Sequence, residues 1–534
     1  MPPAASDVAE RRWDPWPDEP VPALVGPWRA LDVVGLVLVA AAGAVLRFLQ
    51  RSPLWLDEAL SVNIATPPDG GLVEALRHDG HPPLYYALLN AWMDVFGSGP
   101  VAVRSLSAVI GLALLPLAFV AAGRIAGRRA AWAAVLLVAL NPFVLRYSTE
   151  ARMYELVMVL ALAGWLLVDH ALDRPRPHLL AGLVVVTGAL LWTHYWGLWL
   201  VGAAGLGLLG RGVLALRRGE RNRGRASLAV VAALAVGCLT FTPWLPNLLH
   251  QAAHTGTPWA EPSLPTEVAS MSLLDLGGGV AGESVLLAVL FAVFVAVGLL
   301  GRPTGPATVE LDLRTRPEAR RLSILVVATL GLATAVSWAT GAAYASRYFS
   351  VVAPMVLVLI GVGVSRVRGA VAFRVVLVVL LLLGAMAGTR AALTRPRTQA
   401  GVVADAIVER ADGGGGAPYV LVCPDQLGPA LSRELPDDVV LVRYPDLEPG
   451  DLVDWDDYEE RLAEASPAEV AERFLATAGD ADAWLVWYGS YRTHQGTCEA
   501  VLTELQRARP AGHAVVTADT GAFEPSNAYL FPAT

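Results

Sequence analysis

Residues 371–389 read VAFRVVLVVLLLLGAMAGT, an apolar stretch with one charge. A helix needs roughly 20 apolar residues to cross about 30 Å of hydrocarbon, so this stretch is long enough to span a bilayer. Ten further stretches resemble it. The eleven together predict an α-helical polytopic membrane protein, with spans near 31–49, 103–123, 130–146, 153–172, 179–193, 196–210, 226–246, 283–301, 322–341, 350–365 and 371–389.

The composition supports a membrane protein and excludes several other classes. Of 534 residues, 55% are hydrophobic and 16% are charged, and the mean hydropathy is +0.50. Ordinary soluble domains are about a quarter charged, so a soluble fold of this size would lack a polar surface. The formal net charge of −8 argues against nucleic acid as a partner.

The arginines predict the orientation of the spans, because short cytoplasmic loops carry an excess of basic residues. Arginine-rich loops alternate with poor ones, and six arginines lie between 211 and 225. This pattern places the N-terminus in the cytoplasm of a multi-pass cell-membrane protein. Residues 1–30 are then a disordered cytoplasmic tail, residues 31–390 the membrane domain, and residues 391–534 an extracytoplasmic domain.

The C-terminal segment is predicted to be a small α/β domain. Strand-like runs at 419–423, 439–444, 484–488 and 514–518 alternate with helical stretches at 466–478 and 497–509. Cys423 and Cys498 both lie in this domain and could pair in an oxidising compartment, a pairing that the sequence leaves open.

Polar residues in the loop after the first span are candidates for chemistry. Asp57 and Glu58 follow Trp55 and Leu56, and two adjacent carboxylates at a membrane surface are costly unless they are used. On a helix they would diverge by about 100°, so one can face a cavity while a neighbour holds the other. His81 stands before two prolines, on a stiff, extended backbone. An interfacial acidic pair or a helix cap is the structural alternative.

Three more loops on the same predicted side carry ionisable and aromatic residues: Glu150, Arg152 and Tyr154; His194 and Tyr195; Arg347 and Tyr348. Each alone fits a membrane anchor or a local ion pair. Together they suggest a reaction, because a carboxylate can take a proton from a hydroxyl and arginines can hold a phosphate. The set predicts glycosyl transfer from a lipid-linked sugar phosphate.

The motifs WLDE at 55–58, HPPLYY at 81–86, EARMY at 150–154, THY at 193–195 and SRYF at 346–349 occur in that order. Over about residues 31–390 they resemble the GT-C membrane glycosyltransferases, and within them the protein O-mannosyltransferase-like branch with its bacterial relatives. The resemblance implies transfer of a sugar with inversion at the anomeric carbon, and it favours mannose as that sugar. The donor would be a polyprenyl-phosphate sugar, and the acceptor a hydroxyl of a lipid, glycan or protein.

The resemblance also implies residue roles. Asp57 would be the general base, and Glu58 would orient it or bind sugar. The donor would be held by His81, Glu150, Arg152, Tyr154, His194, Tyr195, Arg347 and Tyr348, with Arg152 and Arg347 on the phosphate. Glu150 is either a second carboxylate of the cavity or the partner of Arg152. No metal or other cofactor is expected.

The sequence leaves several alternatives open. The loop from His250 to Gly282 is short where the branch has a large soluble insert, which counts against a protein acceptor. Another GT-C branch would move a sugar such as arabinofuranose or an aminosugar. A multi-pass transporter is the rival from a different class.

Overall fold

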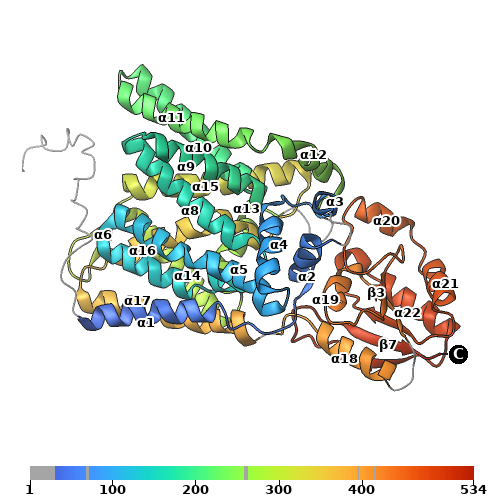
Figure 1. Ribbon diagram of the computed structural model, residues 1–534. Helices are drawn as coiled ribbons and strands as arrows, with labels where there is room; N and C mark the ends of the chain where they lie inside the picture. The colour runs from blue at the N-terminus through green and yellow to red at the C-terminus, as the bar shows by residue number, and fades with distance from the viewer. Residues whose placement is uncertain (1–29, 68–70, 258–262, 395, 413–416, 534) are drawn as a thin grey trace, which may run out of the picture.

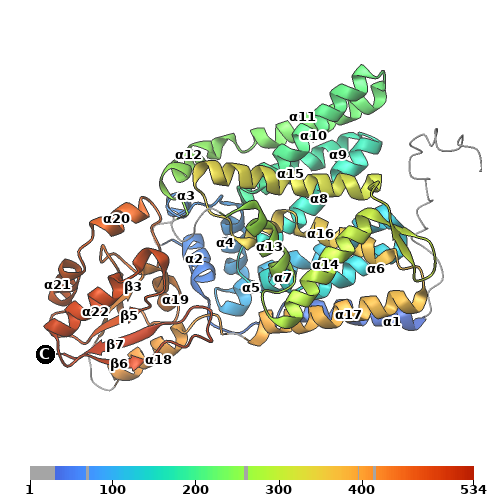
Figure 2. The same cartoon turned by 180° about the vertical axis from the view of Figure 1, so that it is seen from behind.

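The computed structural model describes residues 30–67, 71–257, 263–394, 396–412 and 417–533. The tail predicted for 1–30 lies, apart from Ala30, outside the described residues. A large helical bundle forms the membrane domain, and a smaller domain with a sheet lies at one end of it, against α2 and α3 (Figure 1). The view from behind shows the same arrangement (Figure 2).

The membrane domain is built almost entirely of helices, with one small antiparallel hairpin. Its elements are α1 (Ala30–Leu46), α2 (Leu56–Ala65), α3 (Leu72–Arg77), α4 (Leu84–Phe96), α5 (Pro100–Leu112), α6 (Leu114–Leu140), α7 (Pro142–Ser148), α8 (Tyr154–Asp173), α9 (Pro177–Thr193), α10 (Gly197–Arg217), α11 (Arg221–Leu239), η1 (Thr242–Trp244), α12 (Leu245–His254), α13 (Pro265–Leu276), α14 (Gly282–Leu300), β1 (Gly301–Pro303), β2 (Val309–Leu311), α15 (Pro317–Thr340), η2 (Ser346–Val351), α16 (Ala353–Ser365), α17 (Ala370–Thr389) and η3 (Arg390–Thr394).

Each of the eleven predicted spans coincides with a helical segment. Among the described residues, seven helices are long and apolar enough to cross a membrane, and α1, α9 and α16 are shorter. One of the seven, Pro100–Leu140, has 41 residues and would extend about 60 Å if straight. It is interrupted at Ala126 and Gly127, which have non-helical backbone angles, and this break separates the predicted spans 103–123 and 130–146.

The short helix α16 lies in the centre of the bundle, packed between α6 and α14. Small residues permit close helix contact in membranes, and two glycines of α16 lie where a larger side chain would collide with a neighbouring helix. A Cβ added to Gly361 would meet the backbone of Ala134 at 2.9 Å, and one added to Gly363 would overlap the carbonyl oxygen of Phe294. Because α16 is surrounded by other helices, it does not have to match the thickness of the bilayer.

The C-terminal domain is the predicted α/β domain. Its five-stranded sheet has the order β4-β3-β5-β7-β6, with β3 parallel to β4 and β5, and β7 antiparallel to β5 and β6. The sequence patterns indicated four of the strands but missed β7. The elements are α18 (Ala400–Arg410), β3 (Tyr419–Cys423), η5 (Asp425–Leu427), α19 (Gly428–Ser432), β4 (Val440–Arg443), α20 (Tyr458–Glu464), α21 (Pro467–Ala478), β5 (Ala483–Trp487), η6 (Arg492–His494), α22 (Thr497–Ala508), β6 (His513–Val516) and β7 (Asn527–Phe531).

A disulfide joins Cys423 at the end of β3 to Cys498 in α22, with the two Cα atoms 5.5 Å apart. Both cysteines are fully buried in the core between the sheet and the helices α21 and α22. The pairing that the sequence left open is therefore formed in the structure, and it fastens α22 to the sheet.

Candidate active site

The loops that carry the predicted site residues meet at the end of the bundle that contacts the C-terminal domain. Asp57, in the first turn of α2, faces two arginines from distant parts of the chain. Its Oδ2 lies 3.2 Å from Nη1 of Arg347 and 3.8 Å from Nη2 of Arg152. Arg152 also donates to the carbonyl oxygen of Asp57 at 3.4 Å and to the hydroxyl of Ser61 at 3.2 Å. One carboxylate and two guanidinium groups thus form a single cluster.

His81 extends this cluster by a chain of hydrogen bonds. Arg152 Nη2 lies 3.5 Å from His81 Nε2, and His81 Nδ1 lies 2.7 Å from Asp79 Oδ2. Because a guanidinium only donates, His81 Nε2 accepts and Nδ1–H donates to Asp79. The hydroxyl of Tyr86 donates to the same oxygen at 2.9 Å. Burial raises the pKa of Asp79, but His81 and Arg152 outweigh burial and hold that pKa below its ordinary value.

An aromatic group lies beside the arginines. The ring of His194 is 5.8 Å from Tyr154, 5.5 Å from Tyr348 and 5.9 Å from His81, centre to centre, and Trp196 stacks on Tyr348 at 5.1 Å. The Nε2 of His194 and the hydroxyl of Tyr154 are buried without a hydrogen-bond partner within the described part of the chain. Buried polar atoms normally have partners, so these two atoms are suited to the hydroxyls of a ligand.

Glu58 points away from this cluster, although it is the next residue after Asp57. The side chain of Glu58 has no exposed surface. Arg104 forms a bidentate ion pair with it, in which Nε donates to Oε1 at 2.7 Å and Nη2 donates to Oε2 at 2.6 Å. Arg397 lies 3.3 Å from Oε1 and the Ala151 N–H donates to it at 3.1 Å. Burial raises the pKa of Glu58, but the charges of Arg104 and Arg397 outweigh burial and hold that pKa below its ordinary value. In this arrangement Glu58 is turned away from Arg152 and Arg347 and ties α2 to Arg104 and Arg397.

Two other predicted site residues also lie outside the cluster. Glu150 is 3.2 Å from Nε of Arg146, so it is the partner of an arginine, but of Arg146 rather than Arg152. Tyr195 donates its hydroxyl to the amide oxygen of Gln251 on α12. Glu150 also lies 3.8 Å from Nη1 of Arg397, the arginine that contacts Glu58.

Sequence reasoning missed four residues that shape the site: Asp79, Arg104, Arg397 and Glu524. Arg104 had a signal, since it is the single charge near the start of a predicted span, and ionisable residues in such segments are generally paired. Its partner Glu58, however, lies 46 positions away, and nothing local in the sequence identifies that pairing.

Glu524 reaches α2 from the C-terminal domain. The N–H of Leu56, at the start of α2, donates to Glu524 Oε1 at 3.3 Å. The N-cap residue of the helix, Trp55, makes no capping hydrogen bond with its own side chain. The neighbouring Phe523 meets the Trp55 ring edge-on at 4.9 Å. Burial raises the pKa of Glu524 to about 8, and the nearby charge of Asp57 adds to the effect.

The raised pKa of Glu524 makes a testable prediction about stability. The folded state keeps this proton after the unfolded chain has lost it, so stability falls as pH rises from about 4.5 to about 8. We expect Glu524→Gln to stabilise the protein at pH 8 by on the order of 1–3 kcal/mol and to have little effect at pH 4.5. Thermal unfolding at both pH values measures this.

The matched control is Glu472→Gln, at an exposed position of α21, which should change stability little at either pH. Equal gains from Glu524→Gln at pH 4.5 and pH 8 would contradict the assignment of a buried, protonated carboxyl.

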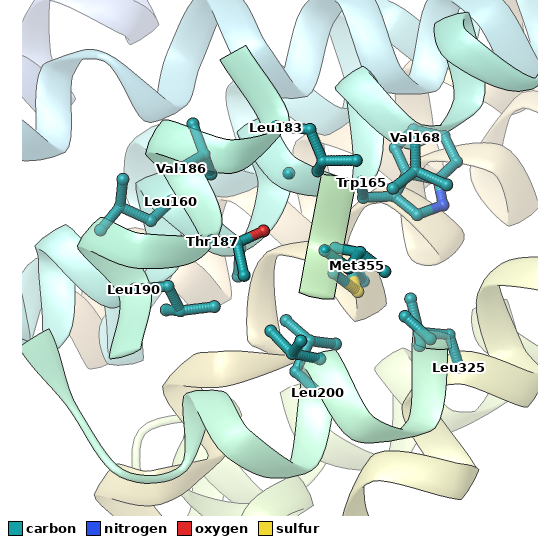
Figure 3. Close-up of a pocket in the computed structure, with 15 residues that line it drawn as sticks. Leu160, Trp165, Val168, Leu183, Val186, Thr187, Leu190, Leu200, Leu325 and Met355 are labelled. Atoms are coloured by element: carbon teal, nitrogen blue, oxygen red, sulfur yellow. The ribbon is translucent and has the colours of Figure 1, made fainter. Parts of the chain in front are cut away.

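A small apolar cavity of about 60 Å³ lies inside the membrane domain, among residues of α8, α9, α10 and α16 (Figure 3). Its walls include Leu190 of α9, Leu200 of α10 and Met355 of α16, and the hydroxyl of Thr187 is the oxygen visible among the labelled side chains. Such walls offer contact to a hydrocarbon but no acid, base or nucleophile.

Comparisons with known proteins bear on the fold and on part of the sequence. A family model described as dolichyl-phosphate-mannose-protein mannosyltransferase matches residues 80–246. No curated protein matches the chain. Among solved structures, ArnT from Cupriavidus metallidurans bound to undecaprenyl phosphate has 16% identity and a TM-score of 0.56, over 95% of this chain and 99% of that chain. The mycobacterial arabinofuranosyltransferase AftD has 18% identity and a TM-score of 0.53, over 95% and 40%.

At these identities the structural similarity shows the fold, and that fold is the one that the loop motifs implied. The family model covers the segment with the HPPLYY, EARMY and THY motifs. The predicted fold class and enzyme class are confirmed, and the transporter alternative finds no support. The chain has the fold of the GT-C membrane glycosyltransferases, and its residues 80–246 match the mannosyltransferase family model.

Proposed function

We propose that this enzyme transfers a sugar, mannose in the first instance, from a polyprenyl-phosphate donor to an acceptor hydroxyl on the extracytoplasmic face, with inversion. The observation that carries the proposal is the contact of Asp57 with Arg152 and Arg347, which puts a base beside two phosphate-binding groups. The description of the matching family names a dolichyl-phosphate-mannose donor, and ArnT was solved with undecaprenyl phosphate; both support this donor class.

The ion pairs suggest how donor binding prepares the base. Before the donor arrives, the carboxylate of Asp57 balances the charges of Arg152 and Arg347. A donor phosphate is a better partner for two guanidinium groups, because it offers several oxygens for charge-assisted hydrogen bonds. When the arginines turn to the phosphate, Asp57 is left to accept a proton.

Transfer then takes place in one displacement. The acceptor hydroxyl gives its proton to Asp57 while its oxygen bonds to the anomeric carbon. The bond between that carbon and the phosphate oxygen breaks, and polyprenyl phosphate leaves with the electron pair. Arg152 and Arg347 stabilise the charge that develops on the leaving oxygen. Attack opposite the leaving group inverts the anomeric centre, as in inverting glycosidases.

The surrounding residues position these groups. The hydrogen-bonded series Tyr86–Asp79–His81 ends on Arg152 and fixes its guanidinium. The unpartnered atoms of His194 and Tyr154 would bind sugar hydroxyls. With the charge of a monophosphate neutralised by arginines, the proposed reaction needs no metal at Asp57.

The direct test is transfer by the purified protein with a set of polyprenyl-phosphate sugars carrying mannose, arabinofuranose or an aminosugar. Transfer from the mannosyl donor, with inverted configuration in the product, supports the proposal. If only one of the other donors supports transfer, the sugar of that donor takes the place of mannose in the proposed function. Failure of every donor with a panel of lipid, glycan and peptide acceptors overturns the proposal.

Arg347 gives a second prediction. Because its charge contacts phosphate in both the ground state and the transition state, Arg347→Ala should weaken donor binding and slow transfer, each by roughly 10–100-fold. Arg347→Lys should restore only part, since a point charge cannot reproduce the planar fork. Donor titration and single-turnover transfer measure the two effects. Arg314→Ala, which breaks an exposed pair with Asp312, should change neither; unaltered donor binding in Arg347→Ala would contradict the phosphate role.

A further inference from the structure

A cluster of ionisable side chains joins the two domains at a place that the proposed reaction does not use. His78, at the end of α3, faces the loop that precedes α20 in the C-terminal domain. Its Nδ1 lies 3.0 Å from Asp454 Oδ1 and 3.2 Å from Asp456 Oδ2. The backbone holds the same loop in place, because the Trp455 N–H donates to the carbonyl oxygen of His78 at 3.0 Å.

We propose that His78, Asp454 and Asp456 bind a divalent cation of the zinc type, which ties the C-terminal domain to the membrane domain. The three ligand atoms all lie within 4.8 Å of one another. Zinc bonds to nitrogen and oxygen of about 2.0–2.2 Å place tetrahedral ligands roughly 3.3–3.6 Å apart. The separations of His78 Nδ1 from the two carboxylate oxygens are close to that spacing. One imidazole with two carboxylates favours zinc or manganese over calcium.

The proposed ligands also make contacts with other side chains, of the kind that orient ligands at metal sites. His78 Nε2 lies 3.5 Å from Glu74 Oε1, as in the carboxylate–histidine–metal arrangement that orients a ligating imidazole. Asp456 Oδ2 is 2.9 Å from His250 Nε2. Arg77 donates to Nδ1 of His250, so the proton of that ring is on Nε2 and points at Asp456. His250 therefore supports a ligand and is not one itself.

The cluster also has unused coordinating capacity and room for water. Asp456 Oδ1 is buried and has no hydrogen-bond partner among the residues that the structure describes. A cavity of about 350 Å³, lined in part by Glu74, His78 and Asp454, opens beside the cluster and gives an ion a path of entry and a place for its water ligands. Arg461 lies 3.6 Å from Asp454 Oδ2, so Oδ1 is the oxygen that Asp454 presents to the ion.

The test is zinc binding by the full-length purified protein, stripped with a chelator and dialysed. We expect isothermal titration and elemental analysis to find one zinc ion per chain and the midpoint of thermal unfolding to rise by at least about 3 °C with excess zinc. Asp454→Asn/Asp456→Asn should lose both the ion and the shift. His254→Ala is the matched control, because His254 pairs with Asp457 at the same interface outside the cluster, and it should keep both.

Two outcomes would overturn the proposal. If the wild-type protein takes up no more zinc than the double variant, the cluster is a set of plain ion pairs between the domains. If Asp57→Asn loses the ion while the double variant keeps it, the cation belongs beside Asp57 instead. Because zinc binding is measured without any sugar donor, failure of the transfer assay does not bear on this result.

Discussion

Asp57→Asn protein is expected to transfer sugar about 10²–10⁴-fold more slowly than wild type, the usual contribution of a general base, while it still binds polyprenyl phosphate. Asparagine keeps the shape of the side chain but cannot accept the acceptor's proton. It also removes the charge that balances Arg152 and Arg347 in the absence of donor. Affinity for polyprenyl phosphate should therefore rise or stay unchanged, whereas a defect in folding would lower it.

Single-turnover transfer and titration with polyprenyl phosphate separate the two effects. Asp94→Asn, at an exposed position of α4 in the same domain, serves as the control and should behave as wild type. Near-normal transfer by well-folded Asp57→Asn protein would remove the general base from the proposed mechanism.

The second large effect is on stability. Arg104→Met leaves Glu58 without its bidentate partner in a site with no exposed surface, and a buried charge deprived of its partner costs about 3–5 kcal/mol. We expect a markedly lower midpoint of thermal unfolding and a lower yield of folded protein. Arg223→Met, which removes an exposed pair with Glu220, should change stability by less than about 0.5 kcal/mol.

The double variant Arg104→Met/Glu58→Met distinguishes a buried ion pair from simple packing. Replacing both members of a buried pair by apolar side chains is often close to neutral, so the double variant should recover much of the loss. If the double variant is as unstable as the single one, the contribution of Arg104 comes from packing and from its bonds to the carbonyl oxygens of Ser52 and Pro53.

The helices were predictable because a membrane span is a local property of composition and length. The same holds for most of the C-terminal domain, where alternating runs marked strands such as Tyr419–Cys423. The strand Asn527–Phe531 was missed although it is as long as β3, and it pairs antiparallel with β5 and β6. Its sequence, NAYLF, carries little signal without those neighbours.

The site was predictable only in its parts. Sequence motifs identified Asp57, His81, Arg152, His194 and Arg347, and the structure brings these residues together. The resemblance assigned the base to Asp57, but the residues alone did not show which of the two adjacent carboxylates faces the arginines. That choice depends on Arg104 and Arg397, which capture Glu58 from other segments of the chain. Contacts of this kind follow from tertiary packing and leave no periodic pattern.

The contact between Leu56 and Glu524 joins residues 468 positions apart, and it has a consequence for biosynthesis. At about 5–20 residues per second, the ribosome needs roughly 20–90 s after making α2 before it reaches Glu524. During that interval the membrane helices can already insert and pack, but the first turn of α2 still lacks its cap. The nascent protein therefore reaches the membrane with α2 uncapped, and the turn that carries Asp57 gains its cap only after Glu524 has been translated.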